Sequence, residues 1–402
     1  MSSRRRSHRT PEPGPERGAT GWVRGPAWDS FFLLGGLWLT PIVCGLAYGS
    51  RDPSAGPVNE LYMVLSATLW IGHRLGSGYL AYCTGAYRPL LSAEPIRFVW
   101  APLATLVLVL AFLVPTGVWP WPRAERIVAV AIVDFGFLTY HFAAQHFGVL
   151  SLYRMRAGPP RPRSARTIDR LFALGVGGAL VFLADAMVGN EFHQDVWLHP
   201  WIGETTLSEA FGSVRVLGTG VVLVASAALL RLERIAPAPS APRAAYLASL
   251  SLLVLAVFWL DPFLFLVLWT AQHWLAAIGL TTAVASGDRA PSPSHWVRTW
   301  QPLSVRPWLL LAFLTALSTL LLPVMEVEAV EPSARYGPAI FPEGWVTALD
   351  RSPWVPVLVA LGFVTGFVHY QLDRAVFRLS DPRVREAAGS LLRGRLYRLG
   401  RP

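Results

Sequence analysis

Five of the nine histidines in the sequence lie inside long apolar runs, where an imidazole is costly unless another group holds it. These five are His73, His141, His146, His273 and His369. Two of them belong to the stretch Tyr140–Gly148, and part of its pattern returns at Ala271–Trp274. Imidazole is the commonest metal ligand among side chains and also transfers protons near neutral pH. The expected chemistry is therefore metal binding or proton transfer inside a membrane.

Two of the histidine-bearing runs also carry polar side chains on the same helical face. Asp134, His141 and Gln145 are spaced i, i+7 and i+11, which places them on one stripe of a helix. In the last run, Asp373 follows His369 by four residues. A metal-bound histidine usually gives its other N–H to a carboxylate or carbonyl. We therefore expect Asp134, Asp373 and Gln145 to be catalytic, either as further ligands or as groups that orient ligands and move protons.

Imidazole together with carboxylate suits iron, zinc, copper or manganese. Sulfur ligation is excluded, because Cys44 and Cys83 lie far apart in apolar runs and form no metal-type pair. The sequence therefore predicts an iron-type site, or one for another divalent transition metal, with His146 as an alternate ligand. The predicted main ligands are His73, His141, His273 and His369. The alternative for each histidine is interhelical hydrogen bonding, and Arg74 with Asp373 could form an internal ion pair.

Four of the histidines share one predicted depth in the membrane. Each lies in a run that crosses in the same direction, roughly 11 to 16 residues from its outer edge, or about 17–24 Å at the rise of an α-helix. The outer edges used for this count are Glu60, Arg126, Pro262 and Pro353. His146 falls about one turn deeper. The shared depth predicts that four helices bring their imidazoles into one slab, and it makes His141 a better ligand than His146.

The composition is that of a polytopic membrane protein, with 53% hydrophobic and 15% charged residues and 17 tryptophans. All 35 basic residues are arginine, which excludes a lysine Schiff base and hence covalently bound retinal. The net charge of +10 does not indicate nucleic-acid binding, because the arginines fall in short loops and at the termini. The predicted partners are instead the lipid bilayer and a lipophilic small-molecule substrate.

Ten apolar runs are long enough to cross a bilayer, so the predicted fold is an all-α bundle of about ten transmembrane helices. The runs lie near 29–48, 59–83, 98–118, 126–153, 168–188, 211–231, 244–260, 262–286, 307–325 and 354–378. Even-numbered loops and both tails are rich in arginine, which places both termini in the cytoplasm and the chain in an inner membrane. No pair of broken helices is evident.

The chain divides into a membrane domain and two tails. Residues 1–25 are rich in Arg and Pro and are expected to be a disordered cytoplasmic tail, followed by the ten-span domain at 26–380. Residues 381–402 form a basic cytoplasmic tail that mixes arginine with leucine. This tail is expected either to lie on an anionic membrane surface or to extend the last helix.

His141, the triplet His146-Phe147-Gly148 and the other histidines within the runs resemble the Brp/Blh β-carotene dioxygenase family. The resemblance covers about a tenth of the chain. It implies a multi-span protein with an iron held by membrane histidines and a lipophilic substrate. The chain also resembles other polytopic bacterial membrane proteins with histidines in the membrane. The HxxxH and HxxHH boxes of membrane hydroxylases and desaturases are absent.

The predicted function is a membrane-embedded, metal-dependent oxidoreductase or oxygenase acting on a lipophilic substrate, with or without a redox partner. A bis-histidine heme protein is an alternative, since it needs only two facing imidazoles. A proton-coupled transporter is another alternative, with Asp134, His141, His273 and Asp373 as a relay. Purely structural polar packing is the remaining interpretation.

Overall fold

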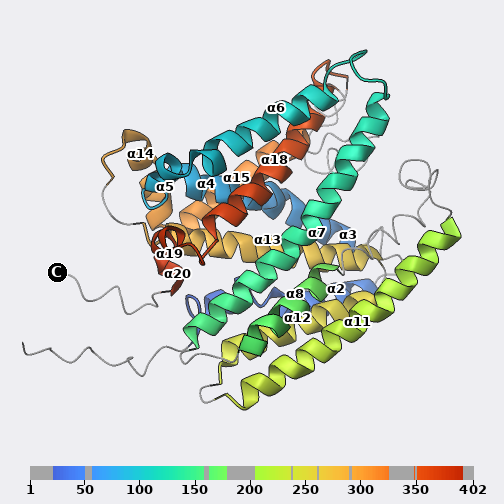
Figure 1. The fold of residues 1–402 in the computed structure, drawn as a ribbon, viewed down its shortest axis with the longest axis vertical. Helices are drawn as coiled ribbons and strands as arrows, with labels where there is room; N and C mark the ends of the chain where they lie inside the picture. Colours follow the sequence, from blue (N-terminus) through green and yellow to red (C-terminus); the bar gives the residue numbers. More distant parts are fainter. Residues whose placement is uncertain are drawn as a thin grey trace, which may run out of the picture.

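The computed structural model describes residues 21–49, 57–157, 163–178, 204–236, 239–259, 262–288, 292–325, 348 and 351–392. Every secondary-structure element within these ranges is a helix, which confirms the all-α prediction (Figure 1). The elements are α1 (Pro26–Phe32), α2 (Gly35–Gly49), α3 (Pro57–Leu65), the π-helix η1 (Ser66–Trp70), α4 (Ile71–Cys83), α5 (Arg88–Ala93), the π-helix η2 (Ile96–Trp100), α6 (Ala101–Leu113), α7 (Arg123–Arg156), α8 (Arg163–Gly178), α11 (Glu204–Arg234), α12 (Ala241–Trp259), α13 (Pro262–Ala285), α14 (His295–Val305), α15 (Pro307–Met325), α18 (Val355–Val376), α19 (Pro382–Ala387) and α20 (Gly389–Leu392).

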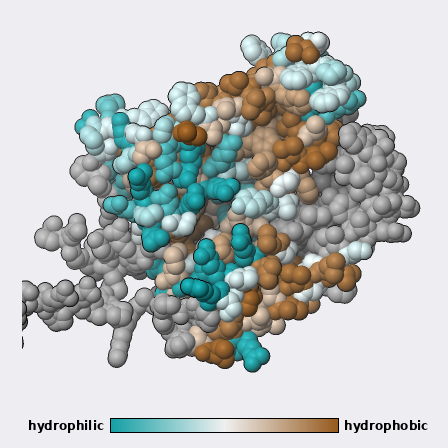
Figure 2. Space-filling model, viewed as in Figure 1, coloured by the Kyte–Doolittle hydropathy of each residue, from teal (hydrophilic) through white to brown (hydrophobic). Residues whose placement is uncertain are grey.

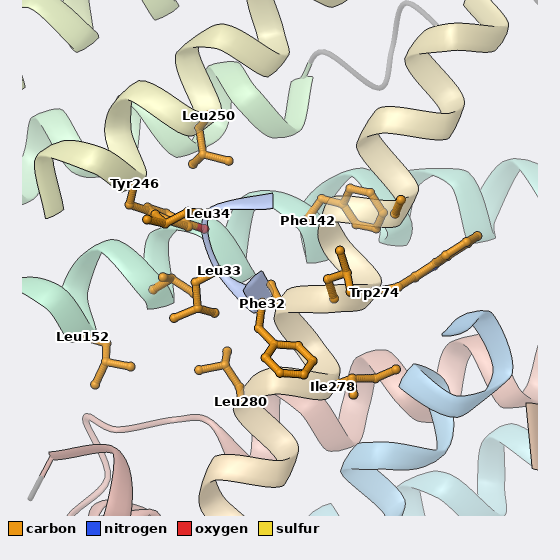
Figure 3. Close-up of a cluster of buried hydrophobic side chains, with 14 of the residues drawn as sticks. Phe32, Leu33, Leu34, Phe142, Leu152, Tyr246, Leu250, Trp274, Ile278 and Leu280 are labelled. Atoms are coloured by element: carbon orange, nitrogen blue, oxygen red, sulfur yellow. The ribbon is translucent and has the colours of Figure 1, made fainter. Parts of the chain in front are cut away.

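Helix α13 crosses the middle of the bundle, with α1, α2, α4, α12 and α15 packed around it (Figure 1). Most of its described side chains are buried. Figure 3 shows its Trp274 and Ile278 close to Phe32 and Leu33 of the α1–α2 connection, with α7 and α12 behind. The element that carries His273 is therefore enclosed on all sides by protein.

Four helical segments are long and apolar enough to cross a bilayer. They are Ile96–Leu113, Arg123–Arg156, Val216–Arg234 and Val355–Val376. Two bent pairs also qualify when each pair is taken as one span: α1 with α2, bent by 50°, and α14 with α15, bent by 105°. The described residues thus support four to six spans, fewer than the ten predicted. The bends also show that the expectation of unbroken helices was wrong.

Each of the ten predicted runs overlaps a helix or consecutive helices, although α8 covers only the part of run 168–188 that lies within the described residues. Part of the difference lies outside the described residues, since α8 is described only to Gly178 and the part of α12 that could be counted is Ala241–Leu255. The inner helices also carry polar side chains. In α4 these include His73 and Arg74, and in α13 they include Gln272 and His273. A helix that is shielded by its neighbours can hold such groups, because they face protein rather than lipid.

The outer surface is apolar over long stretches. On α6, Val107 and Leu108 are 56% and 69% exposed, and on α11, Val216 and Val224 are each 72% exposed. Figure 2 shows apolar side chains gathered over α6 and α11 and polar ones nearer α14 and α19. A soluble protein rarely exposes apolar patches of this extent, whereas lipid favours them.

One end of the bundle holds the last turns of α7, α13 and α18. Tyr153 near the end of α7 donates a 3.0 Å hydrogen bond to Asp29 at the start of the first helix. Asp29 also accepts backbone N–H bonds from Val23, Arg24 and Gly25. Residues 1–20 lie outside the described residues, but Val23 is only 3% exposed. The packed chain therefore begins before the predicted tail boundary at residue 25.

The C-terminal segment packs on this same end. Arg156 of α7 donates to the carbonyl of Leu391 at 2.9 Å, and Leu391 is 1% exposed. Val384 of α19 is fully buried. Residues 393–402 lie outside the described residues. As far as residue 392, the tail does not continue α18 but forms two short helices, α19 and α20, of which α20 packs against α7 and α13.

A buried ion cluster ties α8, α11 and α12 to α7. The guanidinium of Arg243 donates to Asp169 at 2.5 Å, to Glu233 at 3.1 Å and to the carbonyl of Leu150 at 3.0 Å. All three charged side chains are at most 4% exposed, with Asp169 also bonded to Arg154 at 2.6 Å. Such a network fixes one arrangement of helices, because removing either partner leaves an unpaired buried charge.

Helices α4 and α15 approach closely at Gly72, which sits next to His73. A Cβ added at Gly72 would lie 2.8 Å from the carbonyl oxygen of Leu314. We expect Gly72→Ala to lower the melting temperature of detergent-purified protein, at a cost of about 1–3 kcal/mol. Gly148→Ala is the matched helical control, since nothing lies within 4 Å of its Cβ. It should be neutral or stabilise by up to about 1 kcal/mol. Equal melting temperatures for the two variants would contradict this packing.

Candidate metal centre

Four histidines from four helices meet inside the bundle. They are His73 on α4, His141 on α7, His273 on α13 and His369 on α18, and they are 1–6% exposed. The ring centroids are 4.7 Å apart for His73–His369, 4.8 Å for His141–His369, 4.9 Å for His141–His273, 5.1 Å for His73–His273 and 6.5 Å for His273–His369. We call these four residues the histidine cluster. Helices distant in sequence thus bring their imidazoles together in one place.

The π-helical segment η1 orients His73. His73 Nδ1 is hydrogen-bonded to the carbonyl oxygen of Trp70, the last residue of η1. The backbone N–H of Ile71 donates instead to Ser318 Oγ on α15 at 3.1 Å. Because a carbonyl oxygen only accepts, Nδ1 must carry the proton, and Nε2 keeps a free lone pair. The π-turn, a feature often found at functional sites, therefore fixes the tautomer in which Nε2 can bind a metal.

His369 is oriented in a similar way. Its Nδ1 lies 3.2 Å from Ser77 Oγ and 3.8 Å from Asp373 Oδ1, and Ser77 also bonds to the Asp373 carboxylate. Its Nε2 points at His141 Nε2, 3.1 Å away. Two nitrogens about 2.0–2.1 Å from a single ion and 3.1 Å apart subtend an angle of roughly 100° at the ion. The spacing of these two rings is therefore that of neighbouring ligands on one metal.

His273 has no hydrogen-bond partner at either ring nitrogen among the described residues, although it is 1% exposed. One face of its ring stacks on Phe142, with centroids 3.8 Å apart. An unsatisfied buried polar atom costs about 1–3 kcal/mol, so a neutral imidazole in this position calls for a partner. The three imidazoles around it supply only ring contacts.

The possible ligand atoms form two overlapping groups of three. His73, His273 and His369 form one group, and His141, His369 and Asp373 form the other. Within each group the ligand atoms lie within 4.8 Å of one another. The second group combines two histidines with a carboxylate, the set that holds non-heme iron in many oxygenases. His369 belongs to both groups and is the centre of the arrangement.

Asp134 lies beside the histidine cluster rather than in it. Its carboxylate bonds to the hydroxyl of Tyr370, whose ring is 4.9 Å from that of His141. Arg74 interacts electrostatically with Asp134, and its guanidinium donates to the carbonyl of Gly362 and the hydroxyl of Thr365. The acidic neighbour of Arg74 is thus Asp134, and the ion pair with Asp373 considered from the sequence is not among the ion pairs of the described residues.

His146 points away from the histidine cluster. Its Nδ1 is 2.8 Å from the hydroxyl of Tyr246, and it belongs to neither group of ligand atoms. Gln145 is half-buried, and neither atom of its side-chain amide has a hydrogen-bond partner among the described residues. The short repeat would have paired His146 with His273, but the ring that contacts His273 is that of His141. The repeated Gln-His pattern therefore serves different purposes in α7 and α13.

Gln272 anchors the bend between α1 and α2. Its amide nitrogen donates to the carbonyl of Leu33 at 2.8 Å, at the point where the helix is interrupted. Gly35, the first residue of α2, lies against Gln272, and a Cβ added at Gly35 would collide with the Gln272 side chain. A buried backbone carbonyl at an interrupted helix needs a hydrogen-bond donor from elsewhere in the protein. Gln272 thus ties the connection between α1 and α2 to α13, one residue before His273.

Several of these residues could not be found from the sequence. Ser77 and the Trp70 carbonyl lie on the same helical face as His73, but a serine and a tryptophan in a membrane helix are common in structural positions. Tyr370 directly follows His369, and its sequence position gives no sign of its hydrogen bond to Asp134. Only the helix packing reveals which of these groups bond to the cluster.

The chain was compared with protein-family models, with curated proteins and with solved structures, and none of them matches it. The resemblance to the Brp/Blh family gains no support from these comparisons and stays a prediction. The class that fold and site define is an all-helical bundle with a buried histidine and carboxylate cluster.

Gln272→Met tests the anchoring of the bend. Methionine has a similar length but cannot donate, so the Leu33 carbonyl loses its partner, and we expect a loss of about 1–3 kcal/mol in thermal unfolding of the purified protein. Gln371→Met is the matched control. The Gln371 amide donates to the Thr105 hydroxyl at 2.7 Å, and a helical threonine hydroxyl can turn to its own backbone. A larger effect at Gln371 than at Gln272 would refute the assignment.

Proposed function

We propose that this protein is a membrane-embedded, metal-dependent oxidoreductase of the oxygenase type, acting on a lipophilic substrate. An iron-type divalent ion would be held by imidazoles of the histidine cluster, with Asp373 as a further ligand or an orienting group. The ion would bind and activate dioxygen or water next to the substrate. A catalytic metal needs at least one coordination position that the protein leaves open.

The main support is the state of His273. Both of its ring nitrogens are buried and unpartnered among the described residues, while three other imidazoles and one carboxylate surround the same space. In a metal-free bundle this arrangement is costly. A bound ion would satisfy His273 together with His73 and His369, the other two members of its group of ligand atoms. The free energy of metal binding would then offset the cost of burying the cluster.

The ligand chemistry favours iron over softer metals. The two-histidine, one-carboxylate set of His141, His369 and Asp373 is typical of non-heme Fe(II) oxygenases, and neither ligand group contains sulfur. Heme fits less well. Two axial histidines would have to admit a flat porphyrin between them. Even the widest pair, His273 and His369 at 6.5 Å, has the rings of His73 and His141 at 4.7–5.1 Å from both of its members, which leaves no room for the macrocycle. We therefore favour an ion over heme.

The neighbouring polar residues would tune the site. Ser77 and Asp373 would fix the ring of His369 through Nδ1, as carboxylates and hydroxyls do behind metal-bound histidines. Asp134 would act through Tyr370 on the His141 side, where it could take up or return a proton. The unpartnered amide of Gln145 would be free to bond to a polar group of the substrate.

The surroundings favour a lipophilic substrate. Phe142 stacks on His273, and Trp274 lies 6.0 Å from His73, so apolar rings adjoin the cluster. We propose that the other predicted runs also cross the membrane as shielded helices, which gives ten spans. α13, with 24 residues, is about 36 Å long, enough for the hydrocarbon core. Arginine-rich even loops would place both termini in the cytoplasm of an inner-membrane protein, where a redox partner could dock.

A proton-coupled transporter is the second candidate, and the bend between α1 and α2 favours it, because interrupted helices often line transport sites. Its relay would use Asp134, His141, His273 and Asp373. The two candidates differ in their need for metal. A metal-free wild-type protein that moves protons or solute across vesicle membranes would establish the transporter.

Metal analysis of His369→Ala tests the oxidoreductase. Detergent-purified wild type should contain tightly bound iron or a similar divalent metal, and His369→Ala should lose it, because His369 belongs to both ligand groups. His295→Ala is the control, since this exposed histidine begins α14 far from the cluster. His146→Gln should also retain the metal. A metal-free wild type, or metal retained in His369→Ala, would contradict the proposal.

Ser77→Ala tests the groups behind His369. The variant removes the hydroxyl 3.2 Å from His369 Nδ1 but leaves every ligand in place. We expect metal affinity to fall about 10–100-fold, as is usual when a hydrogen bond to a metal-bound histidine is lost. The measurement is competition against a chelator of known affinity. Thr84→Ser serves as a control on the same helix end, since it keeps the hydroxyl that bonds to Leu80.

A further inference from the structure

We propose that Trp269, Tyr246 and Tyr153 form a one-electron relay between the histidine cluster and the end of the bundle at Asp29. This inference rests on the proposed function, because an oxidoreductase centre enclosed by protein must exchange electrons with a donor outside. The donor is a one-electron reductant that docks at the Asp29 end. A relay side chain first passes one electron towards the cluster and is thereby oxidised. The donor then reduces that side chain again by one electron.

The relay is a continuous series of aromatic rings. From His273 the series passes to Phe142 at 3.8 Å and then to Trp269 at 6.0 Å between centroids. From Trp269 it continues to His146 at 5.5 Å, from His146 to Tyr246 at 6.3 Å, and from Tyr246 to Tyr153 at 5.6 Å. These separations are those of packed aromatic side chains. Electron tunnelling falls steeply with distance, so several short steps are far faster than one long step.

Both tyrosines of the relay have a base at the hydroxyl. Tyr246 lies 2.8 Å from His146 Nδ1, and Tyr153 donates to Asp29 Oδ2 at 3.0 Å. Oxidation of a phenol releases its proton, and a buried phenol can lose an electron readily only if a nearby base takes that proton. In each step one electron leaves the tyrosine, the proton moves to His146 or Asp29, and a neutral tyrosyl radical remains. Reduction returns both the electron and the proton.

Other buried tyrosines lack this arrangement. Tyr87 donates to the carbonyl of Val376 at 2.6 Å, and Tyr79 donates to the carbonyl of Trp300 at 3.0 Å. A backbone carbonyl is too weak a base to take the proton of an oxidised phenol. Tyr370 does meet a carboxylate, that of Asp134, but it adjoins His141 and belongs to the site itself. The tyrosines with bases therefore lead from the cluster towards one end.

The relay also assigns a role to His146, as the base that takes the proton of Tyr246. His146 is 1% exposed, contributes to neither ligand group, and bonds to Tyr246. Trp269 is likewise 1% exposed, and its indole N–H has no hydrogen-bond partner among the described residues. A structural role alone would not require a tryptophan with an unsatisfied N–H beside a histidine. If the indole of Trp269 carries an electron between Phe142 and His146, it needs only close ring contact with them and no hydrogen bond.

The experiment uses metal-free full-length protein in lipid nanodiscs, so that its outcome does not depend on the metal. A water-soluble ruthenium photosensitiser with persulfate supplies a one-electron oxidant, and peptide mass spectrometry measures oxidation of Trp269. Exposed Trp296, which is 55% accessible, is the internal reference. We expect Trp269 to be oxidised in wild type although it is buried. Tyr153→Phe and Tyr246→Phe should reduce this oxidation several-fold, whereas Tyr87→Phe should leave it unchanged.

His146→Gln separates electron transfer from a structural effect. Glutamine can still accept a hydrogen bond from Tyr246 but cannot take up its proton. We expect oxidation of Trp269 to fall in this variant, and the wild-type rate to slow in D₂O. Thermal unfolding of each variant identifies any that fail to fold. Trp269 oxidation that is unchanged in folded Tyr153→Phe, Tyr246→Phe and His146→Gln would overturn the relay, whatever the metal content of the wild type.

Discussion

The burial of four neutral imidazoles in one place is the constraint on which the rest of this structure depends. Water is excluded, and a ring nitrogen without a partner costs about 1–3 kcal/mol. The protein satisfies Nδ1 of His73 with a backbone carbonyl and Nδ1 of His369 with Ser77. His273 is left unsatisfied among the described residues. The bundle is thus organised to present free nitrogen lone pairs to one another, an arrangement that makes physical sense if an ion occupies the space between them.

The helices around the cluster are held by contacts far from it. Arg243 joins α8, α11 and α12 to α7 through Asp169, Glu233 and a carbonyl, and Asp29 joins the first helix to the end of α7. Gln272 stabilises the interrupted helix that covers α13. Each contact fixes position more than it adds stability, since buried charges and amides cost desolvation free energy. Fixed positions are what a metal centre requires, because ligands must converge to within tenths of an ångström.

The sequence predicted the helical fold and the residues that converge, and it did so for a physical reason. A helix rises by a constant amount per residue, so His73, His141, His273 and His369 could be assigned a common depth from residue counts alone. The same count placed His146 about one turn further on, and in the structure His146 bonds to Tyr246 and belongs to neither ligand group. Rotation about each helix axis was not predictable, and neither was the π-helical turn that orients His73. The described residues support four to six spans rather than ten, and some of the predicted runs, such as 168–188, continue beyond the described residues.

X-ray absorption spectroscopy at the metal edge of the purified, iron-loaded protein tests the central claim most directly. The account predicts a first shell of nitrogen and oxygen atoms at about 2.0–2.2 Å. It also predicts the outer-shell scattering of at least three imidazole rings, and a smaller imidazole contribution in His369→Ala. A first shell of oxygen only, a sulfur ligand, or the four-nitrogen plane of a porphyrin would contradict it.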